Sequence, residues 1–330
     1  MLFAVGTYTS LGGPGIALIE CHHGHLNLRS ATNAVDNPIW LHASLRRPIL
    51  YVAGSWGEDD QGCVASFAWH ENTLTLLSRQ ETGGASCCHL ALDEEETHLY
   101  AANYTDGSIA VFPLADGRIQ PRCQFLQHAG HSIHPKRQTG PHAHQIVFRP
   151  ESREVFACDL GADQVVVYRR LEDGTLEHQT AIPGTPGTGP RHLIFDGPNR
   201  FYLVGELTGW ISRYEAEQGQ WHLKQILPTV PEGAGENNSA AAVRMDANHV
   251  YVSNRGHDSI AVFEKSEDGA LRFLRTIPTP GEYPRDFQLQ DGGYLLAQQN
   301  RGGVAWMDAS GALKDALDIP GAVCLCPIPD

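Results

Sequence analysis

A pair of short apolar strands joined by a turn containing Gly, Asp or Asn recurs along the chain. Its copies read LFAVGTYT at 2, LYVAGSW at 50, LYAANYTDGSIAVF at 99, VFACDLGADQVVVY at 155, FYLVGELTGWISRY at 201, VYVSNRGHDSIAVF at 250 and YLLAQQNRGGVAWM at 294. A small or polar residue ends the first strand of each copy: Gly6, Gly54, Asn103, Asp159, Gly205, Asn254 and Gln299. These positions imply a period of about 49 residues, and a period of that length indicates a repeat architecture.

Each copy is long enough for four strands. A further strand precedes the pair, as in GPHAHQIVF (140–148) and GPRHLIF (189–195), and another follows a DG turn, as in EDGTLEHQTAIPG (172–184). The apolar runs are short and rich in β-branched and aromatic residues, and none has a sustained helical period. We therefore predict an all-β fold, a seven-bladed β-propeller with four antiparallel strands per blade.

The two ends of the chain predict how the ring closes. The chain opens with what is the second strand of a blade, and GAVCLCPI (321–328) lies at the distance expected for the missing first strand. Pairing the N- and C-terminal strands would hide two strand edges. No linker or change of composition divides the chain, so residues 1–330 are expected to form a single propeller domain.

Composition narrows the function. Asp and Glu number 38 against 24 Lys and Arg, a net charge of −14, which argues against nucleic acid as a partner. No apolar run is long enough to span a membrane, and the N-terminus lacks the basic start of a signal peptide. The eight cysteines form no CxxC pair, so we expect reduced thiols in a cytoplasmic protein. The oligomeric state stays open.

Two sets of positions should meet at one rim of the ring, because the first strand of an antiparallel blade starts where the second strand ends. The starts of the first strands hold Ile39, Cys88, His144, Arg191, Ala241 and Arg285. The ends of the second strands hold Thr7, Ser55, Tyr104, Leu160, Glu206, Arg255 and Asn300. Guanidinium groups bind carboxylates and phosphates bidentately, so this rim predicts a site for a small anionic molecule.

Within this rim we predict three catalytic residues. Glu206 is the only acid at the ends of the second strands, and among arginines it should stay ionised and hold or deprotonate a water molecule. Arg191 and His144 would stabilise an oxyanion. Four substrate-binding residues are expected: His142, Arg255, Arg285 and Arg137, the last in the long irregular segment 127–141.

Other interpretations of the same residues stay open. The arginines could form hydrogen bonds with loop carbonyls or ion pairs with acids between blades. Glu206 could be a solvated residue at a strand end, or one paired with a neighbouring arginine. Five histidines could suggest a metal site: His128, His131, His134, His142 and His144. They lack helical ligand spacing and neighbouring carboxylates, so we expect no metal and no cofactor.

Several long motifs in order resemble the lactonase family of seven-bladed propellers, across essentially the whole chain. They are GTYT (6–9), ANYTDGSIAVF (102–112), GPHAH (140–144), CDLGADQVVVY (158–168), GPRHLIF (189–195), SNRGHDSIAVF (253–263) and YPRDFQL (283–289). The family includes propeller-type 6-phosphogluconolactonases and a carboxymuconate-cyclising enzyme. The resemblance implies a catalytic cluster at His144 (or His142), Arg191 and Glu206, with substrate contacts at Arg255 and Arg285.

Three departures from the family pattern bear on function. Ala242 stands where members usually have an acid, Gly205 replaces an Asn, and Cys87 replaces a Pro. The resemblance implies hydrolysis of a sugar-acid lactone, with 6-phosphogluconolactone expected. The alternatives are opening or cyclisation of a lactone on another carboxylate such as a muconate, or a propeller that only binds a ligand or a protein.

Overall fold

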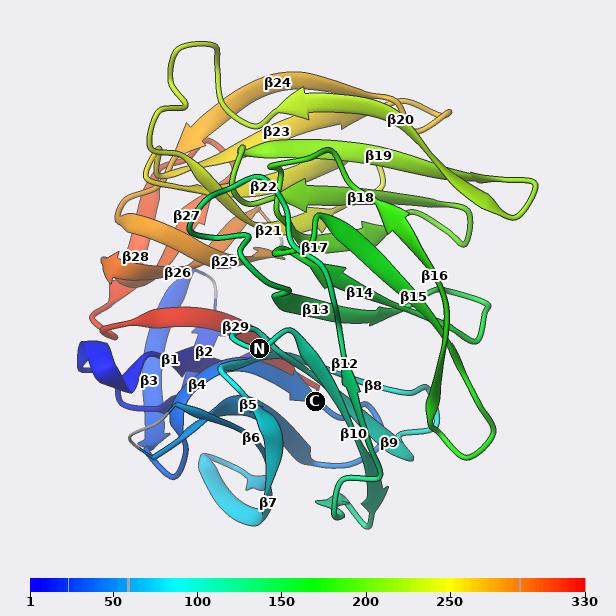
Figure 1. Ribbon diagram of the computed structural model, residues 1–330. Coiled ribbons are helices and arrows are strands. Elements are labelled where there is room, and N and C mark those ends of the chain that lie inside the picture. Colours follow the sequence, from blue (N-terminus) through cyan, green and yellow to red (C-terminus); the bar gives the residue numbers. More distant parts are fainter. Residues whose placement is uncertain (23, 58–59, 291, 330) are drawn as a thin grey trace.

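The computed structural model describes residues 1–22, 24–57, 60–290 and 292–329. Within them the chain forms seven antiparallel sheets, which are the blades of a ring (Figure 1). The blades contain no α-helix in the described residues, and a single 3-10 turn, η1 (Thr9–Leu11), follows the first strand. The predicted seven-bladed β-propeller is confirmed.

The strands of each blade follow one another from the axis of the ring outward. Blade 1 is β29 (Ala322–Ile328), β1 (Leu2–Thr7), β2 (Ile16–His22) and β3 (His25–Thr32). Blade 2 is β4 (Asp36–Ala43), β5 (Ile49–Trp56), β6 (Gln61–His70) and β7 (Thr73–Ala85). Blade 3 is β8 (Cys87–Leu92), β9 (His98–Asn103) and β10 (Ser108–Ala115), with its outer edge in two pieces, β11 (Arg118–Ile119) and β12 (Gln124–Gln127).

The remaining blades follow the same order. Blade 4 is β13 (Ala143–Phe148), β14 (Glu154–Asp159), β15 (Gln164–Arg170) and β16 (Leu176–Pro183). Blade 5 is β17 (Pro190–Phe195), β18 (Arg200–Gly205), β19 (Trp210–Glu217) and β20 (Gln220–Pro228). Blade 6 is β21 (Ser239–Met245), β22 (His249–Arg255), β23 (Ser259–Lys265) and β24 (Leu271–Pro278). Blade 7 is β25 (Glu282–Gln290), β26 (Gly293–Arg301), β27 (Gly303–Asp308) and β28 (Leu313–Leu317).

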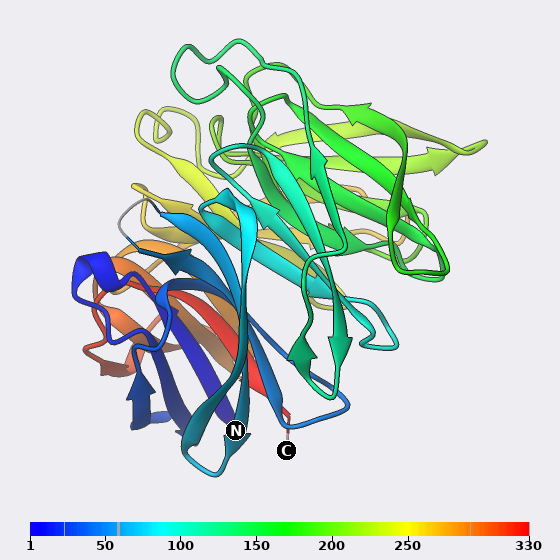
Figure 2. The same ribbon diagram turned by 60° about the horizontal axis from the view of Figure 1, so that its bottom comes forward.

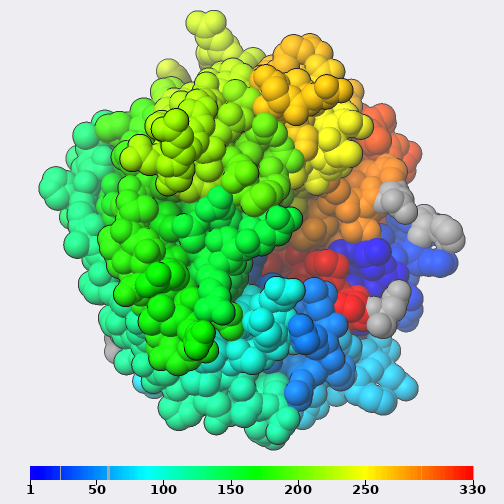
Figure 3. Space-filling model, turned by 90° about the vertical axis from the view of Figure 1, so that its right-hand side faces the viewer, coloured from blue at the N-terminus to red at the C-terminus, as the bar shows by residue number. Residues whose placement is uncertain are grey.

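The ring closes between the two ends of the chain, as predicted. β1 pairs antiparallel with β29, from Leu2 opposite Ile328 to Thr7 opposite Ala322. The first residues and the last residues therefore lie side by side (Figure 2). They belong to the face of the ring shown in Figure 3, where the blue and red terminal segments lie near the middle. The ends of the second strands point to the opposite face.

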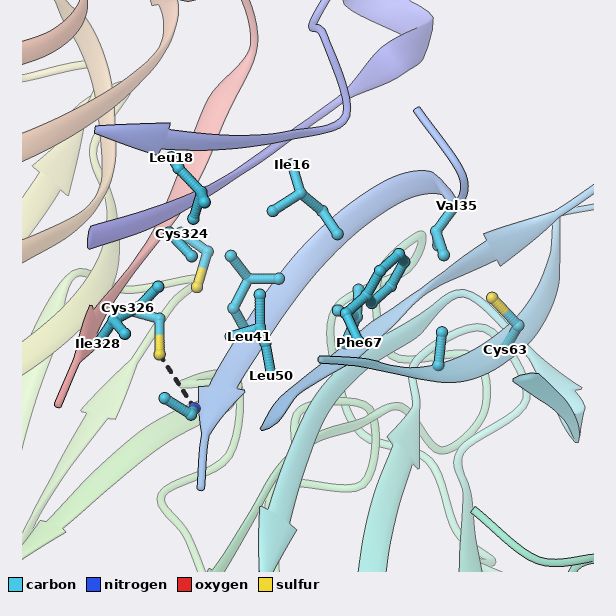
Figure 4. Packing of buried hydrophobic residues seen from close by; sticks show 14 residues of the cluster. Ile16, Leu18, Val35, Leu41, Leu50, Cys63, Phe67, Cys324, Cys326 and Ile328 are labelled. Atoms are coloured by element: carbon cyan, nitrogen blue, oxygen red, sulfur yellow. Dashed lines mark hydrogen bonds between the residues drawn. The ribbon is translucent and has the colours of Figure 1, made fainter. Parts of the chain in front are cut away.

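Apolar side chains fill the space between neighbouring blades. The inner strands are buried on both faces, and their residues form clusters that join each blade to the next. Between blades 1 and 2, Leu18 of β2 packs with Leu41 and Leu50 and with Cys324 and Cys326 of β29 (Figure 4). The thiol of Cys326 accepts a hydrogen bond from the backbone N–H of Ala43 at 3.2 Å. The closing strand is thus held by packing as well as by its sheet.

β-Bulges place one residue of the innermost strand in the axial channel. The register between the first and second strands shifts at Cys88 in blade 3, at His144 in blade 4, at Arg191 in blade 5 and at Arg285 in blade 7. Shifts also occur beside Ile39, Ala241 and Val323 in the other blades. A bulge bends the strand and re-aims a side chain. These shifts explain how the starts of separate first strands converge on one axis.

The break position of β1, Gly6, lies against the neighbouring blade. A Cβ added at Gly6 would lie 2.1 Å from the backbone oxygen of Pro38, so blade 2 excludes a larger side chain there. In blade 7 the expected residue was Gln299, but Gln298 is the one paired at the strand end, opposite Gly303. The ladder between β26 and β27 ends at this pair, as the ladder between β22 and β23 ends at Asn254 opposite Ser259. Gln298 is buried, and its side-chain oxygen accepts a hydrogen bond from Gly281 N–H.

One prediction on membranes is also addressed by the fold. No helix in the described part of the chain has the length and apolar character needed to cross a bilayer.

The closing strand supplies the first testable prediction. Leu325 of β29 is 2% exposed and packs in the cluster between blades 7 and 1. We expect Leu325→Ala to lower the free energy of unfolding by about 2–5 kcal/mol, because truncation leaves a cavity in a packed core. Urea denaturation followed by circular dichroism measures this change.

Leu313→Ala is the matched control, because Leu313 lies on the outer strand β28 and is 52% exposed. Its effect should be within about 0.5 kcal/mol. Equal destabilisation by the two substitutions would contradict the importance of the closing strand.

Candidate functional site

The bulged residues form a layer across the axial channel. Ile39, Cys88 and Val323 make an apolar cluster with Tyr8 and Tyr104 packed against it. His144, Arg191 and Arg285 occupy the corresponding positions of blades 4, 5 and 7. The layer therefore has an apolar side formed by blades 1 to 3 and a basic side formed by blades 4, 5 and 7.

Above this layer, a cavity of about 680 Å³ opens at the mouth of the ring. It is lined by residues from all seven blades and the segment before β13: Tyr8, Ser10, Asn37, Ile39, Ser55, Gly57, Asp60, Ser86, Cys88, Tyr104, Arg137, His144, Glu206, Ser239, Arg255, Tyr283 and Arg285. The size suits a small organic ligand.

Glu206 is the centre of the site. It follows directly after β18, and its backbone N–H donates to Gly189 O at 2.8 Å, which fixes its position beside β17. Oε2 of Glu206 lies 2.9 Å from Nε of Arg191 and 2.8 Å from Nη2 of Arg255. Oε1 lies 2.7 Å from Nη2 of Arg137. One buried carboxylate thus receives three guanidinium groups from different parts of the chain.

These neighbours fix the charge of Glu206. Burial alone would raise the pKa of this carboxyl group, but Arg255, Arg191, His144 and Arg137 hold the pKa well below its ordinary value. Glu206 is therefore ionised at neutral pH, as predicted from the sequence motif. A carboxylate of such low basicity orients and polarises a water molecule more readily than it removes a proton completely.

Arg191 supports Glu206 from below. It is 2% exposed and is not among the residues that line the cavity. Besides Glu206, its guanidinium contacts the backbone oxygen of Ala241 at 2.7 Å and the ring of His192 at 3.3 Å. Burial, followed by repulsion from Arg255 and Arg285, lowers the pKa of Arg191, whereas Glu206 raises it. Groups of the protein thus already bind the guanidinium of Arg191. Its role is therefore to hold the carboxylate of Glu206 in place.

Arg137 reaches the site from the long segment between β12 and β13. Buried Gln138 anchors the segment by donating from Nε2 to Leu160 O at 2.9 Å. Nη2 of Arg137 also donates to the hydroxyl of Tyr104 at 2.8 Å. Its side chain is 41% exposed. The segment therefore reaches the cavity, and Arg137 is the accessible member of the three arginines around Glu206.

His142 is held apart from the cavity. Its ring stacks on Tyr104, with centroids 4.6 Å apart, and its Nδ1 lies 2.8 Å from the backbone oxygen of Tyr104. It is not among the lining residues. His142 therefore contacts a residue of the cavity wall, and His144 is the histidine that faces the cavity.

Arg255 and Arg285 form the wall of blades 6 and 7. Arg255 is 5% exposed and is fixed by Glu206 and by the backbone oxygen of Ala240 at 3.1 Å. Arg285 lies over the ring of Tyr8, 5.5 Å from its centroid. Among the described residues it has neither an ion pair nor a hydrogen bond. Arg285 is thus a guanidinium in the cavity that is available to an anionic ligand.

His144 and two further histidines form a row along the channel, in which each ring meets the next edge to face. The rings of His144 and His192 lie 5.2 Å apart, those of His192 and His89 5.6 Å apart, and His89 stacks on Trp40 at 4.0 Å. All three histidines are at most 5% exposed. Burial, and after it the positive charge of Arg191, lowers the pKa of His144 and His192 well below the ordinary value. For His89 the causes are burial, His42 and then Arg191.

His144 is therefore neutral at pH 7. Its Nε2 lies 3.9 Å from Oε2 of Glu206, which is beyond hydrogen-bond distance. Its Nδ1 is buried and has no partner among the described residues. A neutral imidazole at the cavity wall can donate one hydrogen bond to a ligand oxygen.

The other histidines of the suspected metal site have separate contacts. Nδ1 of His128 lies 2.9 Å from Oδ2 of Asp159, and both are buried. Nδ1 of His134 accepts the backbone N–H of Arg137 at 3.1 Å. In the described residues, no group of three His, Cys, Asp or Glu side chains is placed to bind a metal ion.

The structure also locates the departures from the family pattern. Ala242 is 1% exposed and packs with Phe287 and Leu296 between blades 6 and 7. It does not line the cavity. The position without the usual acid therefore lies between blades, next to Ala241, whose backbone oxygen accepts a hydrogen bond from Arg191.

Several lining residues were not singled out from the sequence. Tyr104 and Ser55 were among the aligned strand ends, so a signal for them existed. Asp60 and Ser86 were not, because they lie in connections between strands whose paths no repeat position specifies. Their convergence depends on turns with positive φ at both residues, 51° and 54°.

The buried histidines predict how stability depends on pH. The folded-state pKa values of His89, His144 and His192 lie below the ordinary value of 6.5. Below about pH 6.5 the unfolded chain binds protons that the folded chain does not, so stability should fall as the pH falls. The free energy of unfolding can fall by at most about 1.4 kcal/mol per pH unit for each histidine. Urea denaturation at pH 7.5, 6.5 and 5.5 measures the slope.

His192→Gln should reduce this slope, whereas His222→Gln, at an exposed position on β20, should leave it unchanged. A free energy of unfolding that is the same at pH 7.5 and pH 5.5 would refute the assignment of neutral buried histidines.

Known proteins resemble this chain over nearly its full length. The family model described as "Lactonase, 7-bladed beta-propeller" matches residues 2–323. A Bacillus subtilis (strain 168) protein named 6-phosphogluconolactonase is 34% identical over 311 residues, which cover 91% of this chain and 88% of that protein.

Solved structures give the same result. The periplasmic gluconolactonase of Pseudomonas aeruginosa matches with a TM-score of 0.90 at 28% identity, covering 98% of each chain. A Lactobacillus plantarum protein matches with a TM-score of 0.88 at 31% identity, again covering 98% of each chain. With its ring of seven blades and a family match over almost every residue, the chain belongs to the lactonase family of seven-bladed β-propellers.

Proposed function

We propose that this lactonase hydrolyses 6-phosphogluconolactone to 6-phosphogluconate. The observation that carries the proposal is an ionised carboxylate, Glu206, placed in one cavity with a guanidinium group, Arg285, that has neither an ion pair nor a hydrogen bond among the described residues. A lactone that also carries a phosphate needs both features. The name of the Bacillus subtilis relative supports the same substrate.

The reaction adds water across the ester bond of the ring. Glu206 orients a water molecule and accepts a hydrogen bond from it while the water oxygen attacks the lactone carbonyl carbon. The carbonyl oxygen becomes an oxyanion, and neutral His144 donates a hydrogen bond to it. The bond from the carbonyl carbon to the ring oxygen then breaks. A proton that came from the water ends on the ring oxygen, and the product is an open-chain hydroxy acid.

The arginines have different parts in this mechanism. Arg191 lies outside the cavity lining, so it acts through Glu206 as a positioning residue. Arg255 touches both Glu206 and the cavity, and it would contact the oxyanion together with His144. Arg137 occupies Oε1 of Glu206 and is exposed. A bound phosphate would draw Arg137 away and leave that oxygen free to hold the water.

The substrate's phosphate would bind at Arg285. Guanidinium groups form paired hydrogen bonds with phosphate oxygens, and no carboxylate in the described residues competes for this one. His142 would support the site through its stack on Tyr104. We expect no metal and no cofactor to take part.

We also propose a cytoplasmic location. All eight cysteines are free in the structure, which is usual in a reducing compartment. One similar structure is that of a protein named periplasmic, so fractionation of cells that produce the full chain would test this part directly.

Replacement of Glu206 tests the mechanism. Glu206→Gln keeps the shape of the side chain but removes the charge that orients the water, so kcat for 6-phosphogluconolactone should fall at least about tenfold. The variant also leaves buried guanidinium groups without their counter-charge, at a stability cost of about 3–5 kcal/mol. Circular dichroism must therefore show that it is folded under the assay conditions.

Glu282→Gln is the control for this experiment, because Glu282 pairs with Arg301 at the surface of blade 7 and does not line the cavity. Its kcat should equal that of the wild type. A folded Glu206→Gln variant with unchanged turnover would remove Glu206 from the chemistry.

Replacement of Arg285 tests the substrate. Arg285→Gln should raise KM for 6-phosphogluconolactone about tenfold or more, because a charge-assisted contact to phosphate is lost. The value of kcat/KM for unphosphorylated glucono-1,5-lactone should change little. Arg301→Gln, whose side chain is 76% exposed, is the control. A wild type that prefers a muconolactone to both sugar lactones would favour the alternative reaction.

A further inference from the structure

The wall of the cavity changes character around the ring. The innermost strands follow the order β29, β4, β8, β13, β17, β21 and β25, and each contacts the next. Blades 6 and 7 and the segment before β13 contribute Arg255, Arg285 and Arg137, and blade 5 contributes Glu206. Blades 1 to 3 contribute a different set: Tyr8, Ser10, Asn37, Ser55, Asp60, Ser86 and Tyr104. Blades 1 to 3 thus contribute hydroxyl, amide and carboxylate groups and no arginine of their own to the lining, although Arg285 lies over the ring of Tyr8 and Arg137 donates to the hydroxyl of Tyr104.

Asp60 is the acid of this second side. The hydroxyl groups of Ser55 and Ser86 each donate to one of its carboxylate oxygens. Its own backbone oxygen accepts the N–H of Ser86 at 3.0 Å. No described arginine, lysine or histidine forms an ion pair with it. Asp60 is therefore a fixed carboxylate, held by hydroxyl groups alone, on the wall of a cavity that otherwise favours anions.

Such a group selects the part of the ligand that it contacts. Each carboxylate oxygen has a second lone pair, so Asp60 can accept hydrogen bonds from further hydroxyl groups. Ser55 and Ser86 have used their protons on Asp60 and can accept hydrogen bonds through their own oxygens, of which that of Ser86 already accepts one from the hydroxyl of Thr105 at 2.8 Å. Hydrogen bonds to a charged acceptor are stronger than those between neutral groups. A phosphate or a carboxylate at this place would be repelled by Asp60.

We propose that Asp60, Ser55 and Ser86 form a subsite for the ring hydroxyl groups of a sugar-acid lactone. The subsite lies between blades 2 and 3, across the ring from Glu206 in blade 5. It deepens and rests on the proposed lactone hydrolysis, because it orients the same substrate. The anionic end lies toward Arg285, the carbonyl toward Glu206, and adjacent hydroxyl groups toward Asp60. A ligand that lacks hydroxyl groups donates no hydrogen bond to this subsite and gains no affinity from it.

The test compares two lactones with the same six-membered ring. Glucono-1,5-lactone carries the hydroxyl groups, and δ-valerolactone does not. Asp60→Asn should lower kcat/KM for gluconolactone about tenfold or more, chiefly through KM, because Asn keeps the shape of the side chain but loses the charge. It should leave kcat/KM for δ-valerolactone unchanged. Equal losses for both lactones, or no loss for either, would overturn the subsite.

Two further variants control the experiment. Asp116→Asn, an exposed position paired with Arg47 at the edge of blade 3, should change neither value. Ser55→Ala removes one hydroxyl group and leaves Asp60 held by Ser86 alone, so it should show a smaller loss, and with gluconolactone only. If Asp60→Asn does not fold, the Ser55→Ala result decides: a loss confined to gluconolactone supports the subsite, and no loss overturns it.

A binding measurement separates the subsite from the reaction. Isothermal titration with D-gluconate, the open-chain hydroxy acid, should show binding to the wild type and to Asp116→Asn. Binding to Asp60→Asn should be about tenfold or more weaker. If the wild type hydrolyses no lactone, the proposed function fails while this titration still reports on the subsite. Equal gluconate affinity in Asp60→Asn and the wild type would overturn the subsite even in an active lactonase.

Discussion

The structure of the site depends on a single buried carboxylate, Glu206, and the guanidinium groups that it holds together. Arg191 comes from blade 5, Arg255 from blade 6 and Arg137 from the segment before blade 4. A buried charge is costly unless it is paired and hydrogen-bonded. Without Glu206, two almost fully buried arginines would repel each other at the mouth of the ring. The carboxylate that we assign to the chemistry is thus also the group that allows so many cations to share one cavity.

The ring supplies what a single blade could not. A β-bulge at the start of the first strand turns one side chain toward the axis, and closure of β1 on β29 holds all of these strands at fixed angles. The chemical groups stand on strands and strand ends, which apolar packing between blades keeps rigid. Only the segment with Arg137 adds an exposed cation, and its proposed movement is the one adjustment that the mechanism requires.

Much of this arrangement could be predicted from the sequence, because the repeat carries its own register. Aligning the copies placed His144, Arg191 and Arg285 at equivalent strand starts and Glu206 and Arg255 at equivalent strand ends, and the structure brings all five together. The alignment failed by one residue in blade 7, where Gln298 ends the ladder between β26 and β27 and is therefore the equivalent position. It also could not separate a residue that lines the cavity, such as His144, from one that supports it, such as Arg191.

The sequence alone determined the number of blades, the way the ends join and most of the strand starts and strand ends at the rim, since these follow from periodicity and strand alternation. Tertiary structure decided which atoms meet. The three contacts on Glu206, the neutral state of the channel histidines and the position of Asp60 opposite the arginines all depend on burial and on turns outside the repeat. The physical reason is that periodicity specifies where a residue lies along its strand and which way its side chain points. Charge pairing and desolvation depend instead on distances between blades.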